Sequence, residues 1–343
     1  MSTIQEVASA AGVSTATVSR ALSNPEVVAK ATRRKVMNAV AALEYSPNAA
    51  AKSLRTLRTG KLLVTVPDIA NPFFSLIIQG IEEAAQREGY AVLLGDTRQE
   101  PQREERYALM LRRKEADGLI FLGHRLPKTL AGWMREHSAT APVVNGCEFS
   151  PRLGVPSAHI DNAAAAHQAM DHLYRLGHRR IGLITGPLVS PLSRDRLRGA
   201  MSRAAAQNAK RQLAVVHGDF SIDSGIAAAA QLLKQADSPT AVFCFNDEMA
   251  IGVMDYAHRR KLRVPDDLSV VGFDDIRFAR YLTPALTTIS QPMLDIGRET
   301  VRLLLEILRD SKAKPASVTL AHKLLIRAST AAPRKRPLGS DSN

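Results

Sequence analysis

Residues 13–25 read VSTATVSRALSNP, a stretch in which several hydroxyl side chains surround a single arginine. Short side chains let a helix approach another molecule closely, and a guanidinium can donate several hydrogen bonds in a fixed planar geometry. These residues could therefore recognise a polar or anionic surface. The alternative is an ordinary solvated helix that happens to come first in the chain.

A second set of polar side chains follows apolar, strand-like runs. In open parallel sheets, ligands bind beyond the carboxyl ends of the strands. Each such residue alone is more typical of a helix cap than of a ligand contact, but their convergence on one rim predicts a polar cleft between two lobes. The set consists of Asp68, Asp96, Asn145, Asp161, Asp219, Asn246, Asp247 and Asp274.

The sequence contains no G-x-G-x-x-G, G-x-x-x-x-G-K-[ST] or G-x-S-x-G motif, so neither a phosphate loop nor a nucleophile elbow is indicated. His159, His167 and His172 are separated by eight and five residues, which does not place a pair on one helix face. Cys147 and Cys244 lie in apolar runs, which favours reduced core thiols over a disulfide. We expect no catalytic residue, no metal and no cofactor.

The formal net charge of +13 is unevenly distributed along the chain. Residues 1–61 hold nine Lys and Arg against three Glu, which gives +6 for this segment. A clustered basic excess favours a polyanionic partner, although a membrane surface would also fit on charge alone. Neither an apolar run long enough to span a bilayer nor a secretory signal is present in the sequence, so we expect a cytoplasmic protein.

Three short helices are expected to position the hydroxyl-rich stretch. Thr3 and Glu6 form a capping box, and Gly12 permits a tight turn. Ser14 is expected to cap the second helix and Thr32 the third. Two helices joined by a short turn that contains glycine make a helix-turn-helix unit.

From Lys61 onward, apolar runs alternate with helical stretches such as 74–87, 163–176, 222–234 and 249–261. This order predicts parallel sheets covered on both faces by helices, and its length exceeds one doubly wound domain. Two similar lobes are therefore expected. The predicted strands are LLVTVPD, AVLLGD, DGLIFLG, PVVNGC, RIGLITG, LAVVHGD, TAVFCFND and LSVVGFDD.

Ordered motifs extend these observations. They are TIQEVASAAGVSTATVSRAL, YSPNAAAKSLR, NPFF, IDN, LGHRRIGLITGP, FCFNDEMAIG, VPDDLSVVGFDD and TPALTTISQP. Together they resemble the LacI/GalR family of bacterial transcription regulators, whose core is similar to periplasmic sugar-binding proteins. VPDIANPFFSLIIQGIE and NGCEFSPRLGVPSAHIDN are most similar to the nucleoside-responsive branch of that family, the branch of the cytidine repressor.

The resemblance implies an N-terminal all-α helix-turn-helix head and an α/β core of two doubly wound parallel-sheet lobes of the periplasmic-binding-protein type. The expected head spans residues 1–45, the hinge 46–60, the core 61–333 and a basic disordered tail 334–343. The first lobe would comprise about 61–161 and 292–322. The second would comprise about 162–291 and 323–333.

The resemblance also assigns DNA contacts. Thr15, Ala16 and Arg20 would read bases, and Arg20 can bond O6 and N7 of one guanine. Contacts to the DNA backbone are expected from Ser14, Thr17, Ser19, Asn24 and Tyr45. In the hinge, Leu54 would wedge into the minor groove, with Lys52 and Arg55 on the flanking backbone. Paired hinge helices require a homodimer, and hence a palindromic operator of double-stranded DNA.

The core would hold a small effector between its lobes. Phe73 and Phe74 taken alone fit core packing as well as ligand contact, and the resemblance places them, with Asn71, at the ligand. Similarity to the ribose-binding pattern favours a pentose-bearing effector, namely a nucleoside, with a free sugar as the alternative. The remaining effector-binding residues implied are Asn145, Asp161, Arg196, Phe220, Asn246, Asp274 and Gln291.

These expectations describe a dimeric, ligand-responsive repressor. A sugar-binding protein without DNA function is disfavoured, because it would leave residues 1–60 without a purpose. An enzyme is disfavoured because the nucleophile, metal and phosphate motifs are missing.

Overall fold

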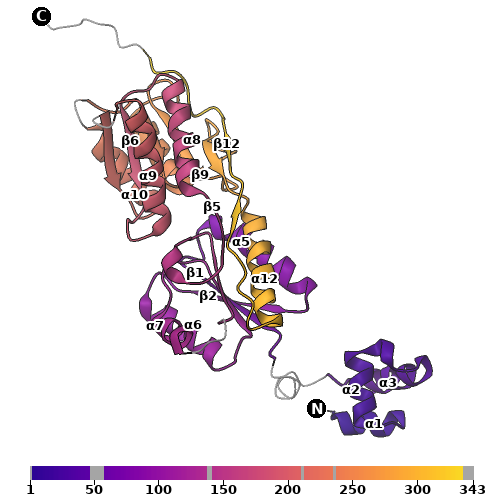
Figure 1. Cartoon of the computed structure of the whole chain (residues 1–343). Coiled ribbons are helices and arrows are strands. Elements are labelled where there is room, and N and C mark those ends of the chain that lie inside the picture. The colour runs from indigo at the N-terminus through magenta and orange to yellow at the C-terminus, as the bar shows by residue number, and fades with distance from the viewer. Residues whose placement is uncertain (1, 47–57, 137–140, 210–211, 235–236, 335–343) are drawn as a thin grey trace, which may run out of the picture. The chain divides into compact units, whose positions relative to one another are not determined.

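The computed structural model describes residues 2–46, 58–136, 141–209, 212–234 and 237–334. The chain divides into two compact units, residues 1–60 and residues 61–343. The smaller unit is the head, and the larger is the two-lobed core (Figure 1). Lys52, Leu54 and Arg55 of the expected hinge lie outside the described residues.

The head contains three α-helices, α1 (Ile4–Ala11), α2 (Thr15–Ser23) and α3 (Lys30–Ala42), with a 3-10 turn, η1 (Pro25–Val27), before the third. Both interactions of the capping box between Thr3 and Glu6 are present. Gly12 ends α1 with a φ of 65°, a left-handed conformation that glycine adopts at little cost. The short turn between α1 and α2 therefore follows from local residue chemistry.

A small apolar core holds the three helices together. Val7, Val18 and Val36, one from each helix, are completely buried, and small alanines fill the space between them. The prediction that Thr32 caps α3 is wrong. The helix begins two residues earlier, at Lys30, because Val28 is extended and packs against the head core, which leaves Thr32 inside the first turn.

The first lobe is built on a six-stranded sheet of order β11-β5-β4-β3-β1-β2, in which every described strand pair is parallel. Its strands alternate between two apolar clusters, so that Leu62 contributes to one face and Leu63 to the other. The strands are β1 (Lys61–Val66), β2 (Ala91–Asp96), β3 (Gly118–Phe121), β4 (Val143–Gly146), β5 (Ser157–Ile160) and β11 (Val318–Leu320).

Helices cover both faces of this sheet. α5 (Pro72–Arg87) and α12 (Met293–Arg309) pack together on one face, and Figure 1 shows them side by side. α6 (Pro101–Arg112) and α7 (Lys128–Glu136) cover the other face. A 3-10 turn, η2 (Pro151–Leu153), precedes β5.

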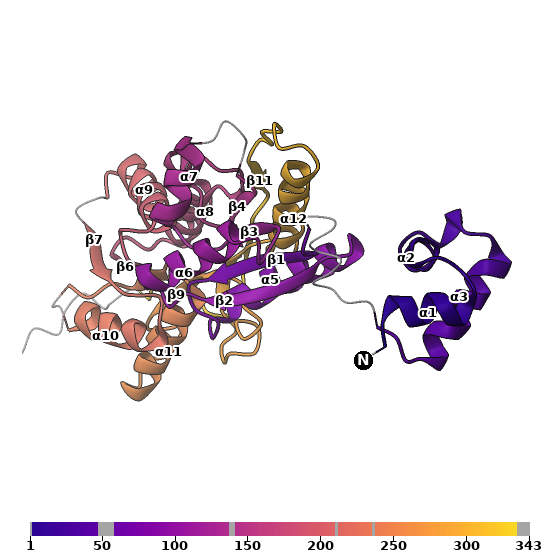
Figure 2. The ribbon, with the colours of Figure 1, turned by 90° about the horizontal axis from the view of Figure 1, so that it is seen from below.

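The second lobe repeats this architecture on a sheet of order β12-β10-β9-β8-β6-β7, in which β12 is antiparallel to β10. Figure 2 shows one helix pair, α8 and α9, on one side of the sheet and a second pair, α10 and α11, on the other. Its strands are β6 (Ile181–Thr185), β7 (Leu213–His217), β8 (Ala241–Cys244), β9 (Ser269–Asp274), β10 (Thr287–Ser290) and β12 (Lys323–Leu325). Its helices are α8 (Asn162–Arg175), α9 (Pro191–Ala206), α10 (Ile222–Leu233) and α11 (Asp247–Arg259).

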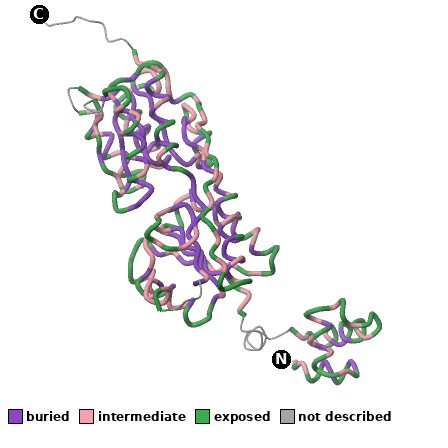
Figure 3. Tube along the Cα trace, in the orientation of Figure 1, coloured by how far each residue is buried: buried purple, intermediate pink, exposed green. Residues whose placement is uncertain are grey.

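The predicted fold class is confirmed, and all eight predicted strands are present. Four short strands, β5, β10, β11 and β12, were not predicted, because three or four residues are too few to show an apolar pattern. The chain passes between the sheets three times, at β5 to α8, β10 to α12 and β11 to β12. Buried residues concentrate in the interior of each lobe (Figure 3).

None of the helices among the described residues combines the length and the apolar character that crossing a bilayer requires.

Candidate DNA-contacting surface and ligand cavity

The N-terminal end of α2 forms an exposed polar surface on the head. Thr15, Ala16 and Arg20, the three predicted base-reading residues, are all exposed on this helix. The Nε of Arg20 donates to the Ala16 carbonyl at 3.3 Å, which orients the side chain along the helix. Within the described part of the chain, no ion pair involves the Arg20 guanidinium, so it is available to an external acceptor.

The residues predicted to contact the DNA backbone surround this surface. Ser14 is the N-cap of α2 and accepts from the Thr17 amide at 3.2 Å, so its hydroxyl also has a structural role. Ser19 is half-buried, and Asn24 is exposed at the end of α2. Tyr45 is half-buried against the head core, which fixes its ring. A helix N-terminus with exposed hydroxyls suits contacts to phosphate.

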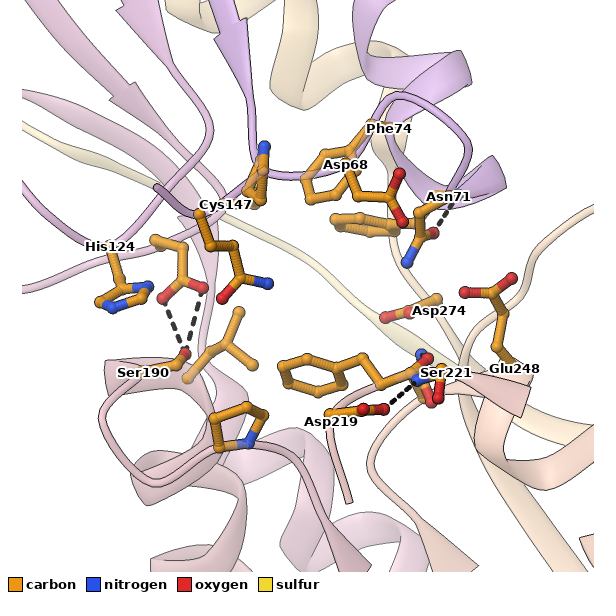
Figure 4. A pocket seen from close by; sticks show the side chains of 18 of the residues that line it. Asp68, Asn71, Phe74, His124, Cys147, Ser190, Asp219, Ser221, Glu248 and Asp274 are labelled. Carbon is orange, nitrogen blue, oxygen red and sulfur yellow. Dashed lines mark hydrogen bonds between the residues drawn. The ribbon is translucent and has the colours of Figure 1, made fainter. Parts of the chain in front are cut away.

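The core contains a cavity of about 450 Å³, lined by residues of both sheets' lobes. Phe73 and Phe74 at the start of α5 line it from the first lobe, with ring centroids 5.1 Å apart in an edge-to-face arrangement. Asn71 caps α5, accepting from the Phe73 amide at 2.9 Å, and thereby fixes where both rings begin. Figure 4 shows Asn71 and Phe74 at one side of the cavity.

Arg196 and Asp274 form the charged centre of the cavity. Nη2 of Arg196 lies 3.6 Å from Oδ1 of Asp274, and Nε of Arg196 donates to Asn162 at 2.8 Å. The guanidinium also bonds the Phe245 carbonyl and lies 3.6 Å from the centroid of the Phe273 ring. These contacts hold Arg196 in one position although it is 3 % exposed.

Burial has opposite effects on the two charges. It raises the pKa of Asp274 to about 7, against the attraction of Arg196 and a hydrogen bond from Gln291. It lowers the pKa of Arg196, opposed mainly by Asp274. Arg196 stays charged near neutrality, since the ordinary pKa of an arginine lies far above it. The pair therefore presents a fixed donor beside a carboxyl acceptor, which suits vicinal hydroxyls.

Asn246 positions the aromatic residue of the second lobe. Its Oδ1 accepts from the Met249 amide at 2.9 Å and so caps α11, while its Nδ2 donates to the Phe220 carbonyl at 2.8 Å. Gly186 makes room for the Phe220 ring, because a Cβ there would lie 2.0 Å from the ring. Asn246 and Phe220 both line the cavity.

Four cavity-lining residues have a left-handed backbone that is unfavourable for residues other than glycine. Their φ angles are 56° at Gln99, 60° at Cys147, 77° at Phe220 and 112° at Asp274. Strain of this kind costs about 1–3 kcal/mol per residue and is concentrated at functional sites. Its presence on both sides of the cavity marks the cavity as the functional centre of the core.

Three predicted effector residues do not reach the cavity lining. Asn145 is fully buried and donates to the carbonyls of Phe121 and Gly123, at 3.0 Å each. Asp161 is exposed and caps α8. Gln291 lies behind Asp274, to which its Nε2 donates at 2.7 Å, so that it orients the carboxyl from outside. As direct ligand contacts, these three residues are corrected by the structure.

The eight strand-end residues also divide. Asp68, Asp219, Asn246 and Asp274 line the cavity, whereas Asp96, Asn145, Asp161 and Asp247 do not. Asp247 is fully buried and accepts from the Thr288 hydroxyl at 2.6 Å and the Ile276 amide at 2.9 Å. Polar residues at strand ends therefore served helix capping and loop anchoring as often as they served the cavity.

Several lining residues were not predicted. His124, Glu148, Ser190 and Glu248 all line the cavity. Glu148 comes two residues after β4, so the strand-end rule that selected Asp68 could have found it. Among the described residues, no group of three or more His, Cys, Asp or Glu side chains has a geometry that could hold a metal ion.

The chain was compared with known proteins. Residues 3–48 match the bacterial regulatory proteins of the lacI family, and residues 170–330 match the periplasmic binding protein-like domain. Over 333 residues the chain is 42 % identical to the HTH-type transcriptional repressor CytR of Escherichia coli (strain K12), covering 96 % of each chain.

Two solved structures are similar. The lac repressor dimer bound to operator and the anti-inducer ONPF has a TM-score of 0.86 at 29 % identity, over 96 % of this chain and 99 % of that one. A LacI family transcriptional regulator from Enterococcus faecium with bound ribose has a TM-score of 0.71 at 28 % identity, over 80 % of this chain and 100 % of that one.

Proposed function

Because this chain belongs to the LacI family of bacterial regulatory proteins and is a DNA-binding repressor with a ligand-binding domain, we propose how its two units work together. The head binds one half of a palindromic operator, and two heads bind together in a homodimer. A pentose-bearing ligand, namely a nucleoside, occupies the core cavity and changes the affinity for DNA. The protein acts in the cytoplasm, where its operator lies.

One observation carries this proposal: the same chain has an exposed, hydroxyl-rich α2 on its head and a strained, polar cavity in its core. Neither feature alone requires a regulator. Together they give the chain one surface suited to DNA and one cavity suited to a small molecule, which is what a ligand-dependent repressor needs.

On the DNA side, Arg20 donates to one guanine in the major groove, while the short side chains of Thr15 and Ala16 allow close approach. Ser14, Thr17, Ser19, Asn24 and Tyr45 contact the phosphates and set the register. In the hinge, Leu54 enters the minor groove, and Lys52 and Arg55 hold the flanking backbone. Substituting Leu54 by Ala would then reduce the bend of the operator.

The homodimer is supported by apolar side chains that the core leaves in solvent. Leu94 on the edge strand β2 is 42 % exposed, and Phe278 and Tyr281 in the second lobe are 47 % and 76 % exposed. Exposed apolar residues on an unpaired sheet edge favour association. The similar lac repressor structure is of a dimer on its operator.

On the ligand side, the hydroxyls of a pentose fit the carboxyl of Asp274 and the guanidinium of Arg196, and Phe73, Phe74 and Phe220 supply faces for rings. Closing the two lobes on this ligand would shift the parts of the core that a dimer joins, and so the spacing of the two heads. The free-sugar alternative is favoured by one observation, the ribose bound to the similar regulator from Enterococcus faecium.

Two measurements on the full-length protein test the proposal. A gel-shift assay with genomic fragments at low salt should retard a palindromic site, and calorimetry with nucleosides and free pentoses should identify the ligand class. If no fragment is retarded, the DNA function is wrong. If only free sugars bind, the nucleoside assignment is replaced by the sugar alternative.

A further inference from the structure

The cavity has a second end that the proposed sugar contacts leave unused. In Figure 4, His124 and Ser190 lie on one side of the view, and Asn71, Glu248 and Asp274 lie on the other. Arg196 and Asp274 account for the pentose end. Side chains at the opposite end must therefore face another part of the ligand.

Glu148 is the central group of this second end. It follows β4 in the first lobe and is 7 % exposed, yet it lines the cavity. The hydroxyl of Ser190, which belongs to the second lobe, donates to its two carboxylate oxygens at 3.1 and 3.0 Å. Ionised, a carboxylate has about four acceptor positions, so one hydroxyl leaves capacity for donors from a ligand.

Ser190 also departs from its usual local role. It stands at the N-cap position of α9, where a serine normally accepts from a backbone amide of the first turn, but it makes no capping hydrogen bond. Its hydroxyl instead reaches across the cavity to Glu148. The local helix interaction has thus been given up for a contact that joins the two lobes at the ligand cavity.

His124 provides an independent indication. Its Nε2 is buried and has no hydrogen-bond partner among the described residues. Buried polar atoms without partners are uncommon and call for a specific explanation, such as an absent ligand. Burial, followed by the positive charge of Arg125, lowers the pKa of His124, so the neutral imidazole can donate from one nitrogen and accept at the other.

The surroundings favour a flat group over a second polyol. Cys147, which precedes Glu148, and Pro187 and Leu192, which flank Ser190 in sequence, also line the cavity. Apolar walls beside a few convergent polar groups are typical of pockets for planar rings. Acceptors at Glu148 call for N–H donors on the edge of such a ring.

We propose that His124, Glu148 and Ser190 form a second subsite that binds the amino-bearing edge of a planar nitrogen heterocycle. The exocyclic amino group donates to Glu148, and an acceptor on the ring pairs with His124. Ser190 holds the Glu148 carboxyl in place from the opposite lobe. This subsite rests on the proposed function, because the pentose end sets the ligand's position, and it narrows that function to nucleosides with an amino-substituted base.

Calorimetry on the full-length protein tests the subsite with three probes. Cytidine has an amino group beside a ring acceptor, uridine has a carbonyl in place of the amino group, and ribose lacks the base. The wild-type protein is expected to bind cytidine at least tenfold more tightly than uridine or ribose. Glu148→Met should weaken cytidine binding at least tenfold and change ribose binding less than twofold.

Two further variants make the result specific. Glu148→Gln keeps one acceptor oxygen and should retain part of the preference, and it carries the test if Glu148→Met does not fold. Glu88→Met removes a carboxylate outside the cavity and should bind all three probes as the wild type does.

The outcomes separate the two proposals. An equal loss for cytidine and ribose, or a wild type that does not distinguish cytidine from uridine, overturns the subsite and leaves the nucleoside regulator intact. A wild-type protein that binds ribose but no nucleoside overturns both the subsite and the nucleoside assignment.

Discussion

Arg196 and Asp274 face each other from α9 and the end of β9, with Nη2 of the arginine 3.6 Å from Oδ1 of the aspartate. Both side chains are nearly inaccessible to solvent, and each stabilises the charge of the other. Gly199, three residues after Arg196, allows this placement. A Cβ there would lie 2.0 Å from the Ala163 carbonyl oxygen, so glycine lets α9 approach α8 closely.

Substituting Arg196 by Ala should lower the affinity for the ligand by about 1.5–3 kcal/mol, because a charged hydrogen bond to the ligand is lost. Calorimetry on the full-length protein measures the loss, and DNA binding without ligand should persist. Arg198→Ala is the matched control, since Arg198 lies on the same helix with its side chain 67 % exposed and paired to Asp195. An unaltered titration for Arg196→Ala would place the ligand elsewhere.

Substituting Arg20 by Ala should cost about 1–3 kcal/mol on the operator and relax specificity at one base pair, because one bidentate base contact is lost. Competition gel shifts with single-base operator variants measure both effects. Arg33→Ala on α3, whose side chain is 44 % exposed, provides the comparison and should affect operator and random DNA alike. Equal losses of Arg20→Ala on both DNAs would contradict base reading.

A nucleoside monophosphate should bind at least tenfold more weakly than the same nucleoside. The cavity lining includes six carboxyl groups, Asp68, Glu148, Asp219, Asp223, Glu248 and Asp274, and one guanidinium, Arg196. Burial, together with the nearby charge of Asp68, raises the pKa of Glu248 to about 7, which reflects this concentration of negative charge.

The double variant Asp68→Asn, Glu248→Gln should reduce the discrimination against the phosphate, because two of the repelling groups are removed. Calorimetry with cytidine and its 5′-monophosphate measures the ratio of affinities. A monophosphate that binds the wild type as tightly as the nucleoside would refute this account of the cavity charge.

The core should lose stability as the pH falls below about 6.5, the ordinary pKa of histidine. His178 is 1 % exposed, with Nδ1 2.9 Å from the Thr240 hydroxyl and Nε2 2.9 Å from the Ala331 carbonyl. Burial lowers the pKa of His178 and of His172 in the folded protein. The unfolded chain therefore binds more protons in this range, so the free energy of unfolding decreases as the pH falls.

Thermal unfolding at pH 7.5 and pH 5.5 measures this effect. His178→Gln should reduce the difference between the two unfolding temperatures, whereas substitution of the exposed His258 by Gln should leave it as in the wild type. If His178→Gln keeps the full difference, other groups control the acid sensitivity.

Local chemistry in the sequence was enough to determine the elements of this protein. The capping box of Thr3 and Glu6, the glycine turn at Gly12 and the cap at Ser14 depend on residues within a few positions of one another. The long apolar runs likewise determined eight strands and their parallel order. The resemblance of ordered motifs then pointed to the family, and identity over nearly the whole chain established it.

Only the tertiary structure decided which polar side chains meet at the cavity. Asp161 and Asp274 both follow strands, but one caps a helix in solvent and the other is buried against Arg196. Glu148 and Ser190 are 42 residues apart and belong to different lobes, so no local pattern couples them. A polar side chain bonds whatever partner the packing of distant segments brings within about 3 Å, and the sequence does not encode that choice locally.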